Sequence, residues 1–151
     1  MNAIQVLKTT RKNILSLASK YSDEQLNFIP EGFSNNLIWN MGHVLVTQQL
    51  LCYRLAGEEC YSANSIIDAY RKGSRTESTA DSSEINMVKQ MLSEMVQNTE
   101  KDIAAGKFAQ YKTYPTSYGI TLESFDDAML FNNVHEGMHL GFMLALQKHI
   151  Q

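Results

Sequence analysis

The chain is poor in residues that interrupt helices and in residues that cross-link a fold. Its 151 residues include two prolines, eight glycines and two cysteines. Long helices are therefore permitted, and Cys52 and Cys60 are too few to form a disulfide framework. We expect both cysteines to be reduced thiols.

Strong charge and long apolar runs are also missing. The formal net charge is −3, whereas proteins that bind phosphate backbones usually carry a basic surface, so we expect no nucleic-acid partner. No apolar run approaches the ~20 residues that span a bilayer, and the first residues lack the pattern of a signal peptide. These absences predict a cytoplasmic protein without a membrane partner, and the length favours one domain over residues 1–151.

Helical periodicity covers most of the chain, over residues 3–20, 36–56, 82–106 and 124–150. The expected N-cap residues are Ser34, Asn35 or Asn36 for the second helix, Ser82 or Ser83 for the third, and Ser124 for the fourth. The third helix should bury Ile85, Leu92 and Ile103. The pattern predicts an all-α fold, an antiparallel up-down four-helix bundle with long connections after helices 2 and 3.

The second helix is apolar nearly all round, which predicts that other helices surround it. Its exception is a narrow polar stripe of Asn40, Thr47 and Arg54, and His43 lies beside that stripe. After this helix, Arg71, Lys72 and Arg75 form a basic cluster in an expected loop. The cluster is either simply solvated or a site for an anion.

The last helix contains the pattern H-E-x-x-H at residues 135–139. Two histidines four residues apart lie on one helix face, where a single metal ion can touch both. A helical projection places Phe131 and Phe142 on the same face, so we expect this face to point into the core. One core histidine alone usually only packs, but His135 and His139 together favour a metal site.

A metal site needs a third protein ligand. His149 lies ten residues beyond His139, about 15 Å along a helix axis, which is too far. We expect His149 to interact with the C-terminal end of the helix instead. His43 remains, near the start of a helix that a bundle can place beside the middle of the last helix.

Two other readings of the H-E-x-x-H pattern fit less well. In a zinc peptidase the glutamate activates water and the third ligand lies downstream. Here twelve residues follow His139, with no Asp, no Glu and no histidine within reach, and the extended pattern has Ala145 where it needs histidine. A di-iron site needs two Glu-x-x-His units, and the chain has one.

The order and spacing of two segments resemble the DinB-like superfamily over essentially the whole chain. The segments are Asn36-Leu37-Ile38-Trp39-Asn40-Met41-Gly42-His43 and His135-Glu136-Gly137-Met138-His139-Leu140-Gly141. The resemblance implies a four-helix bundle that binds a divalent ion, often zinc or nickel, at His43, His135 and His139, and frequently forms a homodimer. Characterised relatives include bacillithiol-type S-transferases and mycothiol-dependent isomerases.

Together these features predict a divalent-metal-dependent enzyme that acts on a small-molecule substrate. The favoured reactions are transfer to a low-molecular-weight thiol and small-molecule hydrolysis, with Glu136 as general base. Trp39, Asn40, Thr47, Asn132 and Glu136 are candidates for the floor of the site. The alternative is a non-catalytic bundle that binds metal or a protein partner.

Overall fold

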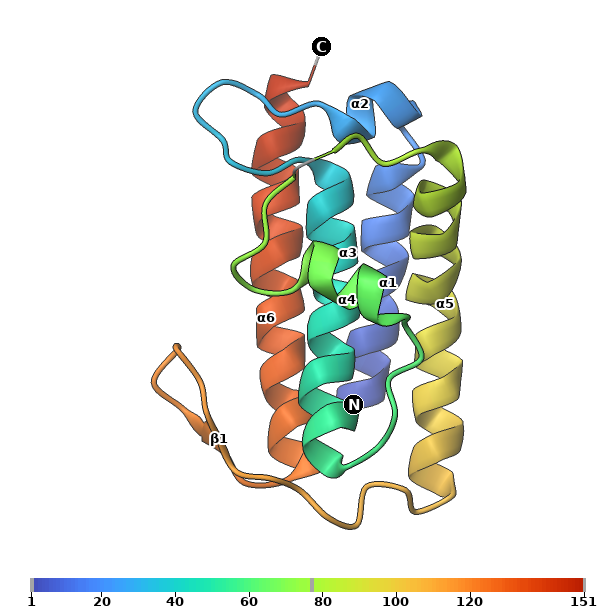
Figure 1. Cartoon of the computed structure of the whole chain (residues 1–151), viewed down its shortest axis with the longest axis vertical. Coiled ribbons are helices and arrows are strands. Elements are labelled where there is room, and N and C mark those ends of the chain that lie inside the picture. The colour runs from blue at the N-terminus through green and yellow to red at the C-terminus, as the bar shows by residue number, and fades with distance from the viewer. Residues whose placement is uncertain (1, 77, 151) are drawn as a thin grey trace.

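The computed structural model describes residues 2–76 and 78–150, and Met1, Glu77 and Gln151 lie outside the described residues. Four long helices lie side by side and form a bundle (Figure 1). They are α1 (Ala3–Ala18), α3 (Leu37–Gln48), α5 (Ser82–Ala104) and α6 (Phe125–Leu146). The described strands are only β1 (Tyr114–Pro115) and β2 (Thr121–Leu122), which pair antiparallel. The all-α prediction is confirmed.

The order of helix directions differs from a simple up-down bundle. In Figure 1, α1 and α6 run upward, whereas α3 and α5 both run downward. The long connection after α3 climbs back along the bundle before α5 begins. The sequence predicted that this connection is long, but not that it reverses the direction of the next helix, as crossover connections do in some bundles.

This crossover carries a short helix, α4 (Asn64–Tyr70), which lies across α3 in Figure 1. The crossing is close because α3 has a glycine at the contact. A Cβ atom on Gly42 would lie 2.3 Å from Cδ1 of Tyr70, which is closer than carbon atoms approach. Gly42 therefore lets the end of α4 approach the histidine-bearing part of α3.

The helix ends follow local chemistry. Asn36 caps α3 by accepting from the Trp39 N–H, and Ser124 caps α6 by accepting from the Asp127 N–H. Asp81 caps α5 in place of the predicted Ser82 or Ser83, because its carboxylate accepts from the Glu84 N–H. Another short helix, α2 (Asp23–Asn27), begins with a capping box at Ser22.

The second predicted helix is longer than α3 alone. It continues as a π-helix, η1 (Gln49–Tyr53), and a 3₁₀ turn, η2 (Arg54–Ala56). A second 3₁₀ turn, η3 (Gln147–His149), follows α6. The predicted extent of the second helix is thus right, and its π-helical turn was not predicted.

Every residue of α3 from Leu37 to Val46 is buried, which confirms that other elements surround this helix. Ile103 on α5 is 40% exposed, so its predicted burial is wrong. Its neighbour Asp102 turns inward instead, because Tyr53 and Tyr61 donate hydrogen bonds to its carboxylate.

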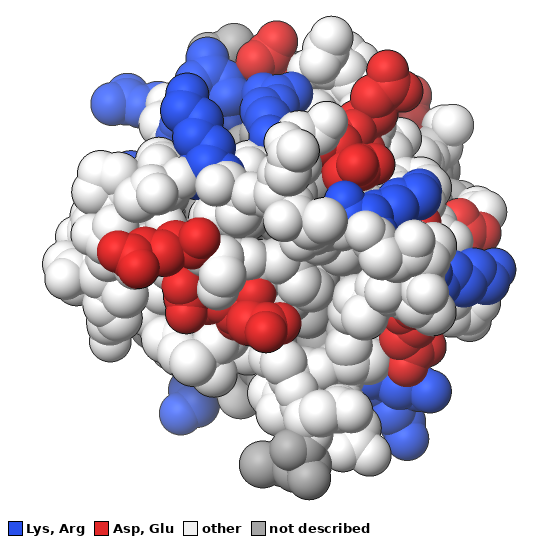
Figure 2. Space-filling view, turned by 90° about the horizontal axis from the view of Figure 1, so that it is seen from below, with Lys and Arg blue, Asp and Glu red and all other residues white. Residues whose placement is uncertain are grey.

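The surface carries both signs of charge. Figure 2 shows Lys and Arg side chains and Asp and Glu side chains in separate small groups on the face seen from below. Among the described helices, none has the length and apolar character to cross a membrane.

Candidate metal centre

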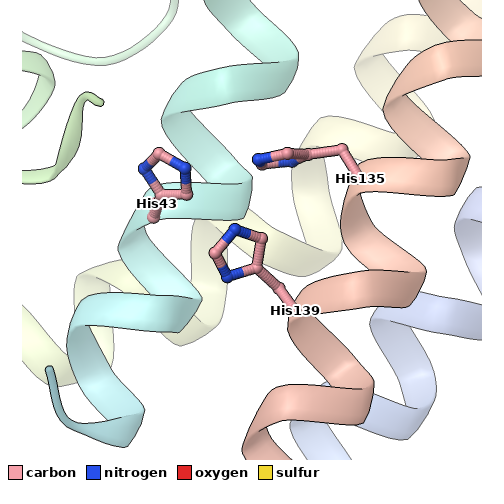
Figure 3. A group of neighbouring side chains, drawn as sticks. All are labelled: His43, His135 and His139. Carbon is pink, nitrogen blue, oxygen red and sulfur yellow. The ribbon is translucent and has the colours of Figure 1, made fainter. Parts of the chain in front are cut away.

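Three histidines meet between α3 and α6. His43 comes from α3, and His135 and His139 come from α6 (Figure 3). One ring nitrogen from each lies within 4.8 Å of those of the other two. The ring centroids are 4.5 to 5.1 Å apart. The structure therefore brings together the three residues that the sequence selected as ligands.

Two of the imidazole rings are oriented by a second hydrogen bond. Nδ1 of His43 donates to the carbonyl oxygen of Tyr70 at 2.7 Å, and Nδ1 of His139 donates to Oδ1 of Asn40 at 2.8 Å. The amide of Asn40 is itself fixed, since its Nδ2 donates to the carbonyl of Asn36. With the proton on Nδ1, Nε2 keeps its lone pair, as metal-binding histidines require.

The remaining ring nitrogens show where bonding capacity is unused. Nδ1 of His135 is buried and has no hydrogen-bond partner among the described residues. A buried polar atom without a partner costs about 1–3 kcal/mol. Nε2 of His43 has only the Thr47 hydroxyl, at 3.4 Å. Such unused nitrogens fit residues that bind a metal ion better than they fit a finished core.

The chain's only tryptophan forms one wall of this centre. The Trp39 ring stacks on His43, with centroids 4.6 Å apart and planes inclined by 10°. It also lies 6.5 Å from the His139 ring. Trp39 therefore shields His43 from water on one side.

The protonation of the three histidines also suits metal binding. Burial, and then the neighbouring histidines, lower the pKa of His135 to about 3. Burial and His43 lower the pKa of His139 to about 4. Burial also lowers the pKa of His43, against the hydrogen bond to Tyr70. The three imidazoles are therefore neutral at pH 7, the form that binds metal ions.

Charged side chains play no part in these shifts. Among the described residues, the causes are burial, the other histidines and the Tyr70 backbone. A divalent ion held here would keep its two positive charges, because no carboxylate compensates them. Such an ion would therefore favour an anionic further ligand, such as a thiolate or a hydroxide.

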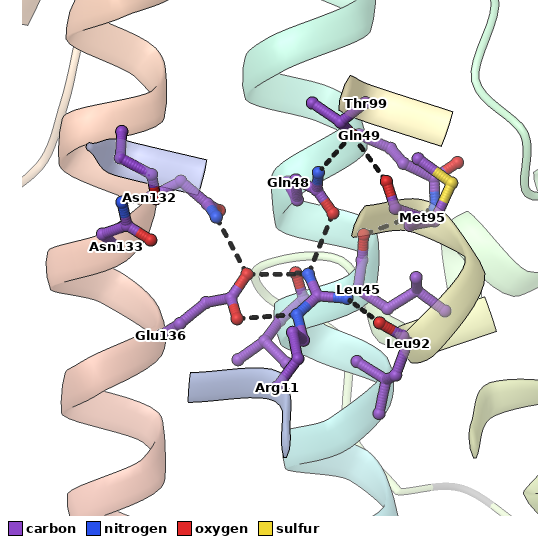
Figure 4. A network of polar contacts seen from close by, with 12 residues as sticks. Arg11, Leu45, Gln48, Gln49, Leu92, Met95, Thr99, Asn132, Asn133 and Glu136 are labelled. Carbon is purple, nitrogen blue, oxygen red and sulfur yellow. Dashed lines mark hydrogen bonds and ion pairs between the residues drawn. The ribbon is translucent and has the colours of Figure 1, made fainter. Parts of the chain in front are cut away.

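Glu136 lies in a different environment from the one that its predicted role as general base requires. Its side chain is completely buried, and its two oxygens accept from Nε and Nη2 of Arg11, both at 2.7 Å (Figure 4). Asn132 donates to the same carboxylate at 2.8 Å. These three bonds hold the fully buried carboxylate in the bundle core, so the geometry does not support the predicted base.

Arg11 is the important residue that the sequence analysis missed. Besides Glu136 on α6, its guanidinium donates to Gln48 and the carbonyl of Val44 on α3, and to the carbonyl of Leu92 on α5. One side chain thus connects all four long helices. The available indication was its position, since Arg11 shares a helix face with Leu7, Ile14 and Ala18, all of which are buried.

The other predicted site residues divide between the two clusters. Trp39, Asn40 and Thr47 contact the histidines, whereas Asn132 belongs to the Arg11–Glu136 cluster. His149 lies apart from the centre, with its ring 5.3 Å from that of Phe33.

The predicted burial of the histidine face is only partly right, because Phe142 is 40% exposed. The centre lies at the edge of the core, since the buried side of α6 is the one that carries Asn132, Glu136 and Met143. Cys52 and Cys60 are free thiols, and burial raises the pKa of both. Neither has the features of a reactive cysteine.

The fold and the centre define a class: a helical-bundle protein with a three-histidine site of the kind that binds a divalent metal. A family model described as the DinB superfamily matches residues 7–143. The chain belongs to the DinB superfamily, and the match includes all three histidines and both long connections. No curated protein matches the chain.

Proposed function

We propose that the protein is a divalent-metal-dependent enzyme acting on a small molecule, with His43, His135 and His139 as the metal ligands. The observation that carries the proposal is the approach of three imidazole nitrogens to within 4.8 Å, two of their rings being fixed by hydrogen bonds at Nδ1. Imidazole ligands suit zinc and nickel.

Transfer of a group to a low-molecular-weight thiol is the reaction that the neutral charge of the three imidazoles favours. A bound divalent ion would supply Lewis-acid chemistry, lowering the pKa of a thiol or a water that it binds. The protein offers three neutral ligands and no compensating carboxylate, which favours an anionic thiolate. Hydrolysis is the related alternative, with hydroxide in place of the thiolate.

The protein's own residues would orient and protect this site. Asn40 and the Tyr70 carbonyl hold His139 and His43 in position. Trp39 excludes water from one side of His43. Glu136 would keep α6 in place through Arg11, and its bonds to that residue also argue against a zinc peptidase.

A second candidate is a non-catalytic metal-binding bundle. The observation in its favour concerns Glu136, the carboxylate next to His135 in the sequence. Arg11 binds this carboxylate in the bundle core, where it is not placed to act as a base. A screen of metal-loaded protein with low-molecular-weight thiols and a chromogenic electrophile separates the two candidates. Turnover with one of the thiols supports the enzyme, and no turnover with any of them favours the non-catalytic bundle.

Metal analysis tests the site itself. Purified protein should contain about one divalent ion per chain, and His43→Ala should lose it. The matched control is His149→Ala, which removes the fourth histidine, outside the cluster. Trp39 fluorescence offers an independent readout because this indole stacks on His43. Unchanged metal content in His43→Ala would refute the three-histidine site.

The homodimer that the superfamily resemblance implies stays a prediction. The outer side of α6 exposes Leu130, Val134 and Leu144 to solvent. Light scattering of purified protein measures the mass directly, and the mass of a single chain would refute the dimer.

A further inference from the structure

A cavity of about 460 Å³ lies beside the metal centre but outside it. It is bounded by the start of α3, by α4 and Arg71, by residues 73–76, by Ser78 and Ala80, and by Glu84 on α5. The three histidines are not among its lining residues. Small-molecule sites usually enclose about 300–1,000 Å³, so the cavity has room for a small organic ligand.

The lining of the cavity combines two kinds of chemistry. Ile38, Trp39 and Tyr70 contribute apolar surface, and Arg71, Arg75 and Thr76 contribute polar groups. Oγ1 of Thr76 is buried and has no hydrogen-bond partner among the described residues. The cavity therefore combines aromatic surface with hydrogen-bond donors.

Both acidic residues that line the cavity already accept a hydrogen bond from a neighbouring side chain. Asp68 accepts from Nε of Arg71 at 3.1 Å, and Glu84 accepts from the Tyr70 hydroxyl. Arg75 has no ion-pair or hydrogen-bond partner within the described part of the chain. Unused donor capacity in the lining therefore comes from Arg75, from the remaining nitrogens of Arg71 and from Thr76.

We infer that this cavity binds a small molecule that carries one anionic oxygen group on an apolar body. Arg75 and Arg71 would bind the anionic group, because guanidinium pairs well with phosphate and carboxylate oxygens. The apolar body would lie against Trp39 and Ile38. Anion binding is thus assigned to Arg71 and Arg75, two members of the basic cluster. The sequence alone did not decide between a solvated cluster and an anion site.

The third member of the cluster supplies an internal comparison. Lys72 is exposed, its ammonium donates to the Ser117 hydroxyl at 2.9 Å, and it does not line the cavity. If an anion were attracted only by the positive surface, Lys72 would contribute as much as Arg75. If the anion enters the cavity, Lys72 contributes little.

The cavity and the metal centre share two residues. Trp39 lines the cavity and stacks on His43, and Tyr70 lines the cavity while its carbonyl accepts from His43. The inference does not rest on metal binding. Trp39 nevertheless makes it measurable, because the only indole of the chain forms part of the wall.

The test uses the full-length chain after treatment with a chelator, at constant ionic strength. Phenyl phosphate and benzoate are titrated while Trp39 fluorescence and heat of binding are recorded, with inorganic phosphate for comparison. We expect saturable binding of at least one aromatic anion, roughly tenfold tighter than inorganic phosphate because the ring is buried. The two aromatic probes distinguish a phosphate ligand from a carboxylate ligand.

Variants then locate the binding site. Arg75→Gln should weaken binding roughly tenfold by removing a charged donor, and Lys72→Gln should leave it unchanged. Ala69→Phe should abolish binding by filling the cavity without changing any charge, since Ala69 lines it. Thermal unfolding of each variant verifies the fold.

Several results would overturn the inference. They are absence of saturable binding by both aromatic anions, equal losses in Arg75→Gln and Lys72→Gln, and full binding by folded Ala69→Phe. Loss of binding in His139→Ala would assign the anion to the metal centre instead. Failure of the metal analysis, in contrast, would leave these titrations unaffected.

Discussion

Two polar clusters lie inside this bundle, and α6 contributes to both. In the Arg11–Glu136 cluster, both carboxylate oxygens and the guanidinium have partners on four helices. In the histidine cluster, the ring nitrogens approach one another, and Nδ1 of His135 has no partner within the described part of the chain. In the first cluster both charged groups have their partners, and the atom without one among the described residues is Oδ1 of Asn132; in the second, the atom without a partner belongs to one of the three histidines that face one another.

The difference separates two uses of buried polar groups. A buried ion pair with all its hydrogen bonds made holds helices in a defined arrangement, and losing one partner is costly. A cluster of neutral imidazoles carries no charge to compensate and can accept a cation. Adjacent residues of α6, His135 and Glu136, thus serve opposite purposes because they point to different sides of the helix.

The largest effect that would test this comparison is the loss of one ionic partner. Glu136→Ala should lower the free energy of unfolding by about 3–5 kcal/mol, because it leaves the Arg11 charge buried without a counter-charge. Urea denaturation measures the change. The double variant Arg11→Met with Glu136→Met should be more stable than Glu136→Ala. A cost below about 1 kcal/mol for Glu136→Ala would contradict a structural ion pair.

The histidine cluster should respond to acid in the metal-free protein. The native pKa values of His135 and His139 lie below the unfolded value near 6.5, so the unfolded chain binds more protons below pH 6.5. Stability is therefore lost as the pH falls, by about 4 kcal/mol between pH 7 and 5 for the two histidines together. Urea denaturation across this range measures the loss. His139→Ala should show a shallower dependence, and an equal slope would exclude the histidines as its source.

The contact between α3 and α4 tests how the histidine centre is supported. Gly42→Ala places a methyl group against the Tyr70 ring and should destabilise the protein by about 1–3 kcal/mol, as overpacking does. It should also weaken metal binding, because the Tyr70 carbonyl orients His43. Gly137→Ala is the matched control on α6, where an added Cβ meets nothing within 4 Å. Equal effects of the two substitutions would contradict the proposed support.

The smallest effect is expected at an exposed ion pair. Arg71 and Asp68 are both more than half exposed, so Asp68→Asn should change the free energy of unfolding by less than about 1 kcal/mol. Urea denaturation at low and high salt measures it. A loss as large as that of Glu136→Ala would show that burial does not explain the difference between the two ion pairs.

Much of the fold could be predicted because helices are specified locally. Apolar periodicity gave the extents of the four long helices, and capping residues such as Asn36 and Ser124 gave their starts. His43 could be selected as the third ligand because a site with two ligands on α6 needs another from a neighbouring helix. The direction of α5 could not be predicted, because a long connection allows the next helix to run either parallel or antiparallel to the preceding one.

The burial of Glu136 could not be predicted for a related reason. A helical projection centred on His135 and His139 treats Glu136 as a polar residue beside the site. Its burial depends on Arg11, which is 125 residues away in the sequence. Such pairing across the fold leaves no local periodic signal, except for a charged residue on an apolar face, as with Arg11 between Leu7 and Ile14.

The π-helix at the end of α3 affects how this chain should be aligned with its relatives. A π-helical turn accommodates one residue more than the α-helix that it interrupts. A relative with a regular α-helix here would need a one-residue gap within residues 49–53. His43 precedes this turn and would align correctly without the gap, whereas the residues from Arg54 onward would be paired one position out of step.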